Sequence, residues 1–100
     1  MSDEERLLKD RDAGYRAKTV IDDPAFQAAY KAVRDAIVES WEQCPIRDRE
    51  GAHELKLMLK IHKDIEGHLR KAVEQGVFAT KELARDKTIP QRIAERLRIA

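Results

Sequence analysis

The chain has 100 residues, of which 42% are apolar, 39% charged and 5% aromatic, and its net charge is +1. This length fits one domain, here residues 1–100, and a charge-rich chain with four glycines and three prolines is typical of long helices, not of β-sandwiches, barrels or doubly wound sheets. No apolar run approaches the roughly 20 residues of a membrane-spanning helix, and the acidic start does not resemble a signal peptide, so we expect an all-α cytoplasmic protein without a membrane partner.

The first predicted helix covers about residues 2–20, within an N-terminal segment 1–22. Ser2 and Glu5 have the spacing of a capping box. In this motif the serine side chain accepts a hydrogen bond from the backbone N–H of the glutamate, and the glutamate side chain accepts one from the backbone N–H of the serine. Acidic residues follow at once, where they suit the positive end of the helix dipole. Gly14 is the weak point of this helix because glycine lowers helix stability.

The second predicted helix covers about residues 24–43. Asp23 is suited to the N-cap and Pro24 to the first helical position, and Pro45 disfavours helical geometry at the preceding residue. Trp41 is interpreted as a core residue near the turn, with a binding hot spot as the alternative. Apolar residues recur at intervals of three and four, which predicts one buried face: Phe26, Tyr30, Val33, Ile37, Trp41 and Cys44.

The third predicted helix covers about residues 48–75, with Asp48 as N-cap and Gly76 at the left-handed position that ends many helices. Its inward seam repeats at intervals of three and four, through Leu55, Met58, His62, Ile65, Leu69 and Ala72. Together the second and third helices predict an antiparallel hairpin over residues 23–76, flanked by shorter helices.

The apolar arc of the third helix is wider than one neighbour needs. Leu57 and Ile61 lie on one shoulder of the seam, whereas Leu59 and Val73 lie on the other. A helix that faces one partner needs a stripe of about 100°. We therefore expect a homo-oligomer, with folding back of the terminal helices as the alternative. The predicted self-interface consists of Leu57, Leu59, Ile61 and His62.

The C-terminal segment, residues 77–100, is basic, with six bases against three acids. Thr80 is suited to cap one short helix and Pro90 to open another. This segment is predicted to contact a protein partner through a helix laid in a groove, or nucleic acid through its positive charge. The predicted contact residues are Arg85, Lys87, Arg92, Ile93, Arg96, Leu97 and Arg98.

The sequence shows no pattern of catalytic or metal-binding residues. His53, His62 and His68 lie nine and six residues apart, whereas ligands on one helix face lie three or four apart. Cys44 is the single cysteine, and no base near it in the sequence would make it a nucleophile. The sequence therefore predicts a protein that is not an enzyme and that binds no metal or cofactor.

One part of the chain resembles small proteins of tailed phages and phage-derived elements. The resemblance is carried by DPAF at 23–26, Trp41, PIRDRE at 45–50, HELKLMLKIHKDIEGHL at 53–69 and Gly76. Such proteins tend to belong to packaging and head assembly. The hairpin is also similar to the oligomerisation region of small terminase subunits, although residues 1–22 are too short and too acidic for the helix-turn-helix domain that usually precedes it.

The resemblance implies a self-associating, non-enzymatic helical adaptor in phage DNA packaging or head assembly. Its implied partners are further copies of itself and a large packaging subunit or another phage structural protein, and its implied location is the host cytoplasm. The alternative is a nucleic-acid-binding accessory protein that uses the basic residues 77–100.

Overall fold

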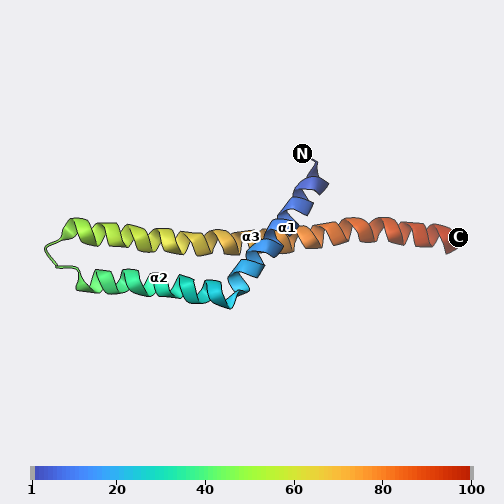
Figure 1. The fold of residues 1–100 in the computed structure, drawn as a ribbon. Helices are drawn as coiled ribbons and strands as arrows, with labels where there is room; N and C mark the ends of the chain where they lie inside the picture. Colours follow the sequence, from blue (N-terminus) through green and yellow to red (C-terminus); the bar gives the residue numbers. More distant parts are fainter. Residues whose placement is uncertain (1, 100) are drawn as a thin grey trace. The chain divides into compact units, whose positions relative to one another are not determined.

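The computed structural model describes the backbone of residues 2–99 and the side chains of residues 2–85. This part of the chain folds into three helices, α1 (Asp3–Asp22), α2 (Pro24–Gln43) and α3 (Arg49–Ile99) (Figure 1), and it contains no β-strand, so the all-α prediction is confirmed. Within the span predicted as one domain, the chain divides into two compact units. We call Thr19–Arg70 the hairpin unit and Met1–Lys18 with Lys71–Ala100 the crossing unit.

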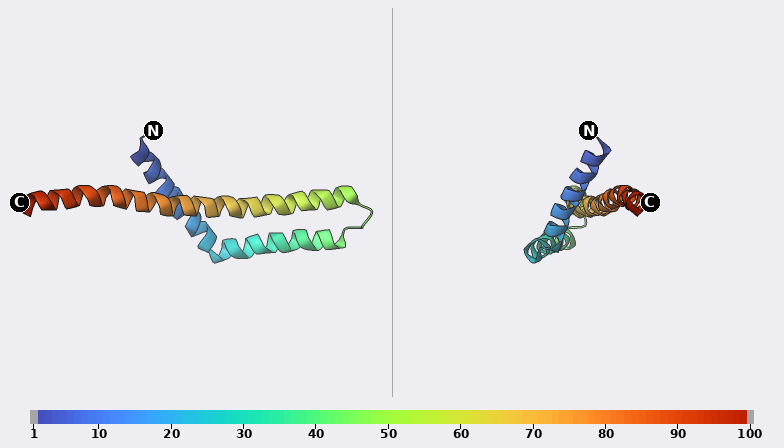
Figure 2. Two further views of the ribbon diagram at one scale, coloured as in Figure 1. Left: turned by 180° about the vertical axis from the view of Figure 1, so that it is seen from behind. Right: turned by 90° about the vertical axis from the view of Figure 1, so that its right-hand side faces the viewer.

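The hairpin unit pairs α2 with the first part of α3 in antiparallel orientation, and the two helices lie side by side in every view (Figures 1 and 2). The carboxylate of Asp23 accepts a hydrogen bond from the backbone N–H of Ala25 at 2.9 Å. The carboxylate of Asp48 accepts one from Gly51 at 2.9 Å. Because these side chains satisfy N–H groups that lack a partner within the helix, both predicted helix starts are confirmed.

The core of the hairpin centres on a reciprocal contact between Tyr30 of α2 and His62 of α3. Their rings stack with centroids 3.7 Å apart. The Tyr30 hydroxyl donates to the backbone carbonyl of His62, and Nε2 of His62 lies 2.8 Å from the backbone carbonyl of Tyr30. Since a carbonyl oxygen only accepts, Nε2 carries the proton. His62, only 7% exposed, is thus a satisfied core histidine.

The hairpin core is narrower than the sequence pattern predicts. Ile37, seven residues after Tyr30 on α2, is buried, but Val33, Trp41, Met58 and Ile65 are each about half exposed, with Trp41 at 52%. The prediction that these four residues lie in the core is therefore wrong. Two helices packed along one seam cover only a strip of each other, and residues at the edges of a wide apolar arc remain in contact with solvent.

The crossing unit is built on a close approach of α1 and α3 at Gly14 and Gly76. A Cβ atom added to Gly14 would lie 2.7 Å from Cα of Gly76, and one added to Gly76 would lie 2.8 Å from Cα of Gly14. Small or apolar side chains flank the contact, with Ala17 buried on α1 and Ala79 and Leu83 buried on α3. The absence of a side chain on both glycines is therefore what lets the helices meet.

This crossing explains why the predicted end of the third helix at Gly76 is wrong. No glycine in the described backbone has a positive φ, so Gly76 is not a left-handed cap, and α3 continues to Ile99. Thr80 caps no new helix, because its hydroxyl donates to the carbonyl of Gly76, one turn earlier, at 2.9 Å. The helix predicted to open at Pro90 is part of the same continuous helix, although proline gives up one helical hydrogen bond.

The N-terminal prediction holds more closely. The helix predicted over about residues 2–20 is α1, which ends at Asp22. The hydroxyl of Ser2 accepts from the backbone N–H of Glu5 at 3.2 Å, as the capping pattern predicts. Gly14 is indeed the distinctive position of α1, but its role is close packing and not helix weakness.

Two glycine substitutions should have opposite effects on stability. Gly76→Ala places a methyl group against the α1 backbone, and overpacking of this kind costs about 1–3 kcal/mol. Gly67→Ala adds a methyl group with no heavy atom within 4 Å, so the higher helix propensity of alanine should stabilise the protein by about 0.5–1 kcal/mol. Urea unfolding of both variants measures the difference. Equal effects of the two changes would contradict the close crossing.

A second prediction isolates the hydroxyl of Tyr30. Tyr30→Phe keeps the ring stack on His62 but removes the donor to its carbonyl, so the free energy of unfolding should fall by about 0.5–1.5 kcal/mol. Tyr15→Phe is the same change on α1 and gives, for comparison, the contribution of a tyrosine hydroxyl outside the hairpin. Thermal or urea unfolding gives both values, and an unchanged stability for Tyr30→Phe would show that this hydrogen bond contributes nothing.

Candidate functional site

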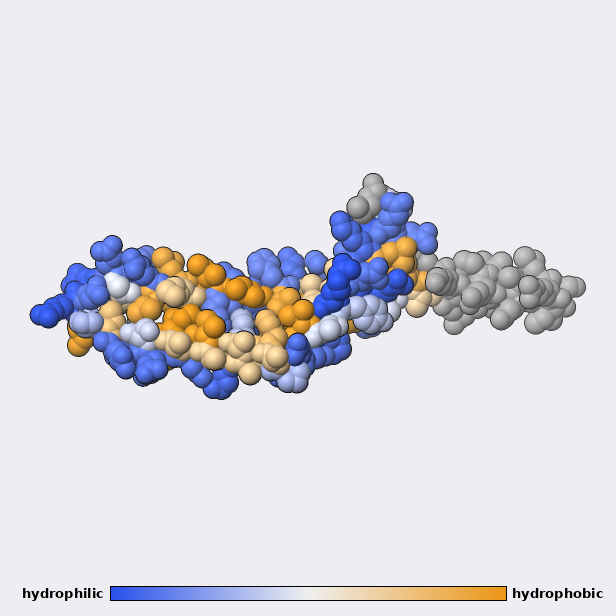
Figure 3. Space-filling view, viewed as in Figure 1, coloured by the Kyte–Doolittle hydropathy of each residue, from blue (hydrophilic) through white to orange (hydrophobic). Residues whose placement is uncertain are grey.

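The hairpin unit exposes a continuous apolar surface, which we call the hairpin face. On α3 it includes Ile61, the most exposed at 61%, with Leu57, Met58 and Ile65 at almost half; Val33 extends it onto α2. The space-filling view shows hydrophobic residues gathered along this part of the molecule (Figure 3). Exposed apolar patches of this kind mark interaction surfaces in soluble proteins.

Helix geometry places these residues on one side of the hairpin. At about 100° of rotation per residue, Leu57, Met58, Ile61 and Ile65 occupy an arc of about 100° adjacent to the seam. Val33 occupies the corresponding arc of α2. Because the rotation sense reverses in an antiparallel neighbour, arcs that precede the seam on both helices point to the same side.

Alanines extend the hairpin face across α2. Four exposed alanines repeat at intervals of four, three and four, namely Ala25, Ala29, Ala32 and Ala36. This is the spacing of a helix–helix seam. Short side chains allow the axis of a neighbouring helix to approach closely, so this part of α2 offers little steric barrier to a docked helix.

The predicted self-interface residues divide between surface and core. Leu57 and Ile61 belong to the hairpin face. Leu59 is partly buried. His62 faces α2 within the chain and has its hydrogen bond and its stacking partner there, so its ring is not available to a second copy. The spacing of these four residues predicts that they share one wide apolar arc of α3. It does not show which part of that arc α2 covers.

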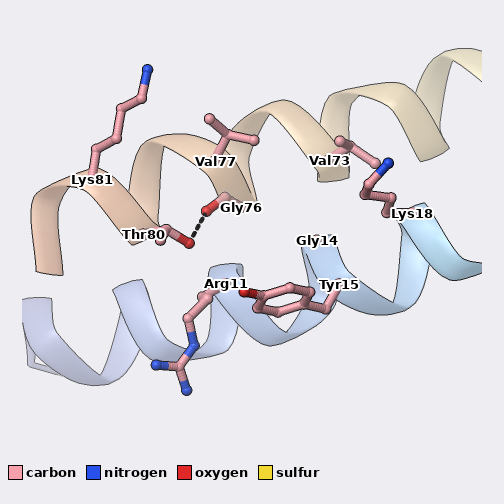
Figure 4. Close-up of a pocket in the computed structure, with 9 residues that line it drawn as sticks. All are labelled: Arg11, Gly14, Tyr15, Lys18, Val73, Gly76, Val77, Thr80 and Lys81. Carbon is pink, nitrogen blue, oxygen red and sulfur yellow. Dashed lines mark hydrogen bonds between the residues drawn. The ribbon is translucent and has the colours of Figure 1, made fainter. Parts of the chain in front are cut away.

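A second candidate surface lies in the crossing unit, beside the glycine contact, and we call it the crossing groove (Figure 4). It has a volume of about 260 Å³. It is lined from α1 by Arg11, Gly14, Tyr15 and Lys18, and from α3 by Val73, Gly76, Val77, Thr80 and Lys81. Tyr15 and Val77 are large apolar residues that remain at least half exposed there.

Local patterns in the sequence do not predict the crossing groove. Its signal is the presence of a glycine in each of two otherwise helix-favouring segments, at Gly14 and Gly76. Each glycine alone suggested a local effect, a weak point or a helix end. The pair has a common explanation only when the two segments are known to cross.

Most of the predicted C-terminal contact residues lie outside the described side chains. Of that set only Arg85 is described, and its guanidinium pairs with the carboxylate of Glu82 at 3.7 Å. The others are Lys87, Arg92, Ile93, Arg96, Leu97 and Arg98, for which the structure gives a helical backbone and no side-chain surroundings.

A row of lysines follows α3 within the hairpin unit, beside Leu57 at the edge of the hairpin face. Lys56, Lys60 and Lys63 are exposed, lie three or four residues apart and border one shallow hollow together with His53. Two other cations on the hairpin have partners: Lys31 pairs with Asp35 at 2.5 Å and Arg70 with Glu66 at 2.7 Å. Among the described residues, the three lysines of this row form no ion pair.

Within residues 2–85 no group of three or more His, Cys, Asp or Glu side chains is placed to hold a metal ion. Cys44 is a free, partly buried thiol beside the turn, where its Sγ atom approaches the backbone carbonyl of Asp48 at 3.7 Å. None of the helices, over the residues searched, is both long and apolar enough to cross a bilayer.

Comparison with known proteins adds no relative: no family model, no curated protein and no solved structure matches the chain.

Proposed function

We propose that this protein is a self-associating, non-enzymatic helical adaptor whose copies join through the hairpin face. The observation that carries the proposal is the exposure of Leu57, Met58, Ile61 and Ile65 along one arc of α3. Burial of apolar area is the main driving force of association. A second hairpin supplies an apolar surface of the same length as the one it covers.

A second copy suits the hairpin face better than an unrelated partner because the face is extended, straight and built from two helices. Two such hairpins packed face to face make a four-helix bundle, a common solution for helices with wide apolar arcs. A two-fold axis makes such a contact self-complementary. The exposed alanines of α2, at Ala29 and Ala36 among others, permit the close approach that this packing requires.

For the biological setting we propose DNA packaging or head assembly in a tailed phage or a phage-derived element. The support is the resemblance of residues 23–76 to small proteins of that kind and to the oligomerisation hairpin of small terminase subunits. In this proposal the oligomer presents repeated binding surfaces to a large packaging subunit or another structural protein in the host cytoplasm. No side chain is assigned a chemical step.

The oligomeric state tests the proposal. Light scattering or sedimentation at micromolar concentration should show a species larger than a monomer. Leu57→Glu/Ile61→Glu places charge in the hairpin face and should yield a smaller, folded species, because unpaired charge is costly in an apolar interface. Lys60→Gln/Lys63→Gln changes the net charge by the same amount and should leave the assembly intact. A monomeric parent chain would refute self-association.

Nucleic-acid binding is the second candidate function, and the lysine row favours it. The lysine row presents three cations without an ion-pair partner, Lys56, Lys60 and Lys63. The segment 77–100 adds further positive charge. Contacts to phosphates release counterions, so such binding weakens steeply with salt. Oligomerisation would repeat the lysine row and raise the affinity for nucleic acid through avidity.

A salt titration distinguishes the two functions. If the lysine row binds DNA or RNA, gel-shift affinity should fall steeply as salt rises, and Lys56→Gln/Lys60→Gln/Lys63→Gln should reduce the steepness of the log–log plot by about three. The matched control is Lys9→Gln/Lys18→Gln/Lys81→Gln in the crossing unit. Absence of binding at low salt would exclude this candidate.

A further inference from the structure

We propose that the crossing groove binds an acidic amphipathic segment of a partner protein, with one apolar side chain of that segment held between Tyr15 and Val77. This surface belongs to the crossing unit, and the inference does not depend on the hairpin face or on the proposed self-association. It rests on where the groove lies, on its size and on the charges around it.

The groove lies directly beside the glycine contact. Gly14 and Gly76 bring the two backbones together, and both glycines line the groove. Tyr15 of α1 and Val77 of α3 both line the groove, and the close-up shows the Tyr15 ring lying along α1 (Figure 4). Tyr15 is 63% exposed and Val77 50%, so both remain able to contact a docked side chain.

The size of the groove favours a side-chain anchor over a small-molecule ligand. Its volume of about 260 Å³ falls below the range of roughly 300–1,000 Å³ typical of small-molecule and cofactor pockets. Gly14 and Gly76 are among the residues that line it, and Val73 and Val77 contribute apolar side chains to the lining. Interfaces concentrate their binding energy in apolar side chains that enter pockets of this kind.

The charges around the groove indicate an acidic partner. Arg11, Lys18 and Lys81 line it, and no aspartate or glutamate does. Asp12 lies close by and accepts from the Arg11 guanidinium at 3.2 Å. That ion pair is exposed on both sides, and exposed pairs contribute little, so Arg11 retains donors for a carboxylate of the partner. Complementary charge of this kind orients and selects a partner.

A nucleic acid is a poorer fit to the same groove. Phosphate contacts need cations but no apolar floor, and proteins that hold single strands stack successive bases on several aromatic side chains. The groove offers one aromatic ring, Tyr15, beside the aliphatic side chains of Val73 and Val77. An apolar anchor flanked by carboxylates matches both the apolar lining, Val73 and Val77, and the cations of the groove, Arg11, Lys18 and Lys81.

Selection from a random peptide library against the full chain tests the proposal without assuming a sequence. Enriched peptides should carry an apolar residue flanked by aspartate or glutamate. A synthetic copy of one enriched peptide should bind less tightly by at least about tenfold to Lys18→Glu/Lys81→Glu, since attraction becomes repulsion. Val77→Asp should weaken it similarly, whereas Val77→Leu should retain binding.

Lys56→Glu/Lys60→Glu carries the same charge change in the hairpin unit and should bind the peptide like the parent chain, and circular dichroism checks that all variants remain helical. Enrichment of basic or uncharged peptides, no enrichment, or equal binding to the groove variants would overturn the proposal. A smaller oligomer for Val77→Asp would assign the groove to a second copy of the chain and overturn the proposal. Loss of DNA binding in Lys18→Glu/Lys81→Glu, without selection of acidic peptides, would assign the groove to nucleic acid and also overturn the proposal.

Discussion

The reciprocal contact between Tyr30 and His62 sets the register of the whole hairpin. Each side chain hydrogen-bonds to the backbone of the other residue, and the two rings stack on each other. Because residues 30 and 62 lie opposite each other, the pairing is symmetric about Ile46 in the turn. A slip by one residue would break both hydrogen bonds and the stack together, so this contact also decides which apolar residues face α2 and which form the hairpin face.

Local patterns in the sequence predict where the helices start. The length of α3 and the exposure of its apolar residues depend on contacts between segments that are distant in the chain. Asp23 and Asp48 cap their helices through hydrogen bonds that span two or three residues, and such short-range chemistry is visible in the sequence. Gly76 resembles a helix end in the same local terms, but its partner Gly14 is distant in the chain. Periodicity likewise placed Met58 and Ile65 on an apolar arc without showing whether a neighbour covers them.

The two candidate surfaces differ in the interactions they offer. The hairpin face is broad, apolar and weakly charged, which suits association with a like surface. The crossing groove is small, with an apolar floor and a cationic rim, which suits recognition of one acidic segment. A chain that self-associates through the first and recruits a partner through the second would present several copies of one groove, the arrangement by which weak single contacts become a firm attachment.

The glycine crossing also has a thermodynamic and kinetic consequence. Glycine and alanine lose no side-chain rotamer freedom when they are buried, and Gly14, Ala17, Gly76 and Ala79 are the buried small residues at the crossing. Docking of α1 on α3 therefore costs little side-chain conformational entropy at these four positions, and Leu83 is the larger side chain buried there. Few rotamers therefore reorganise when the crossing forms or opens.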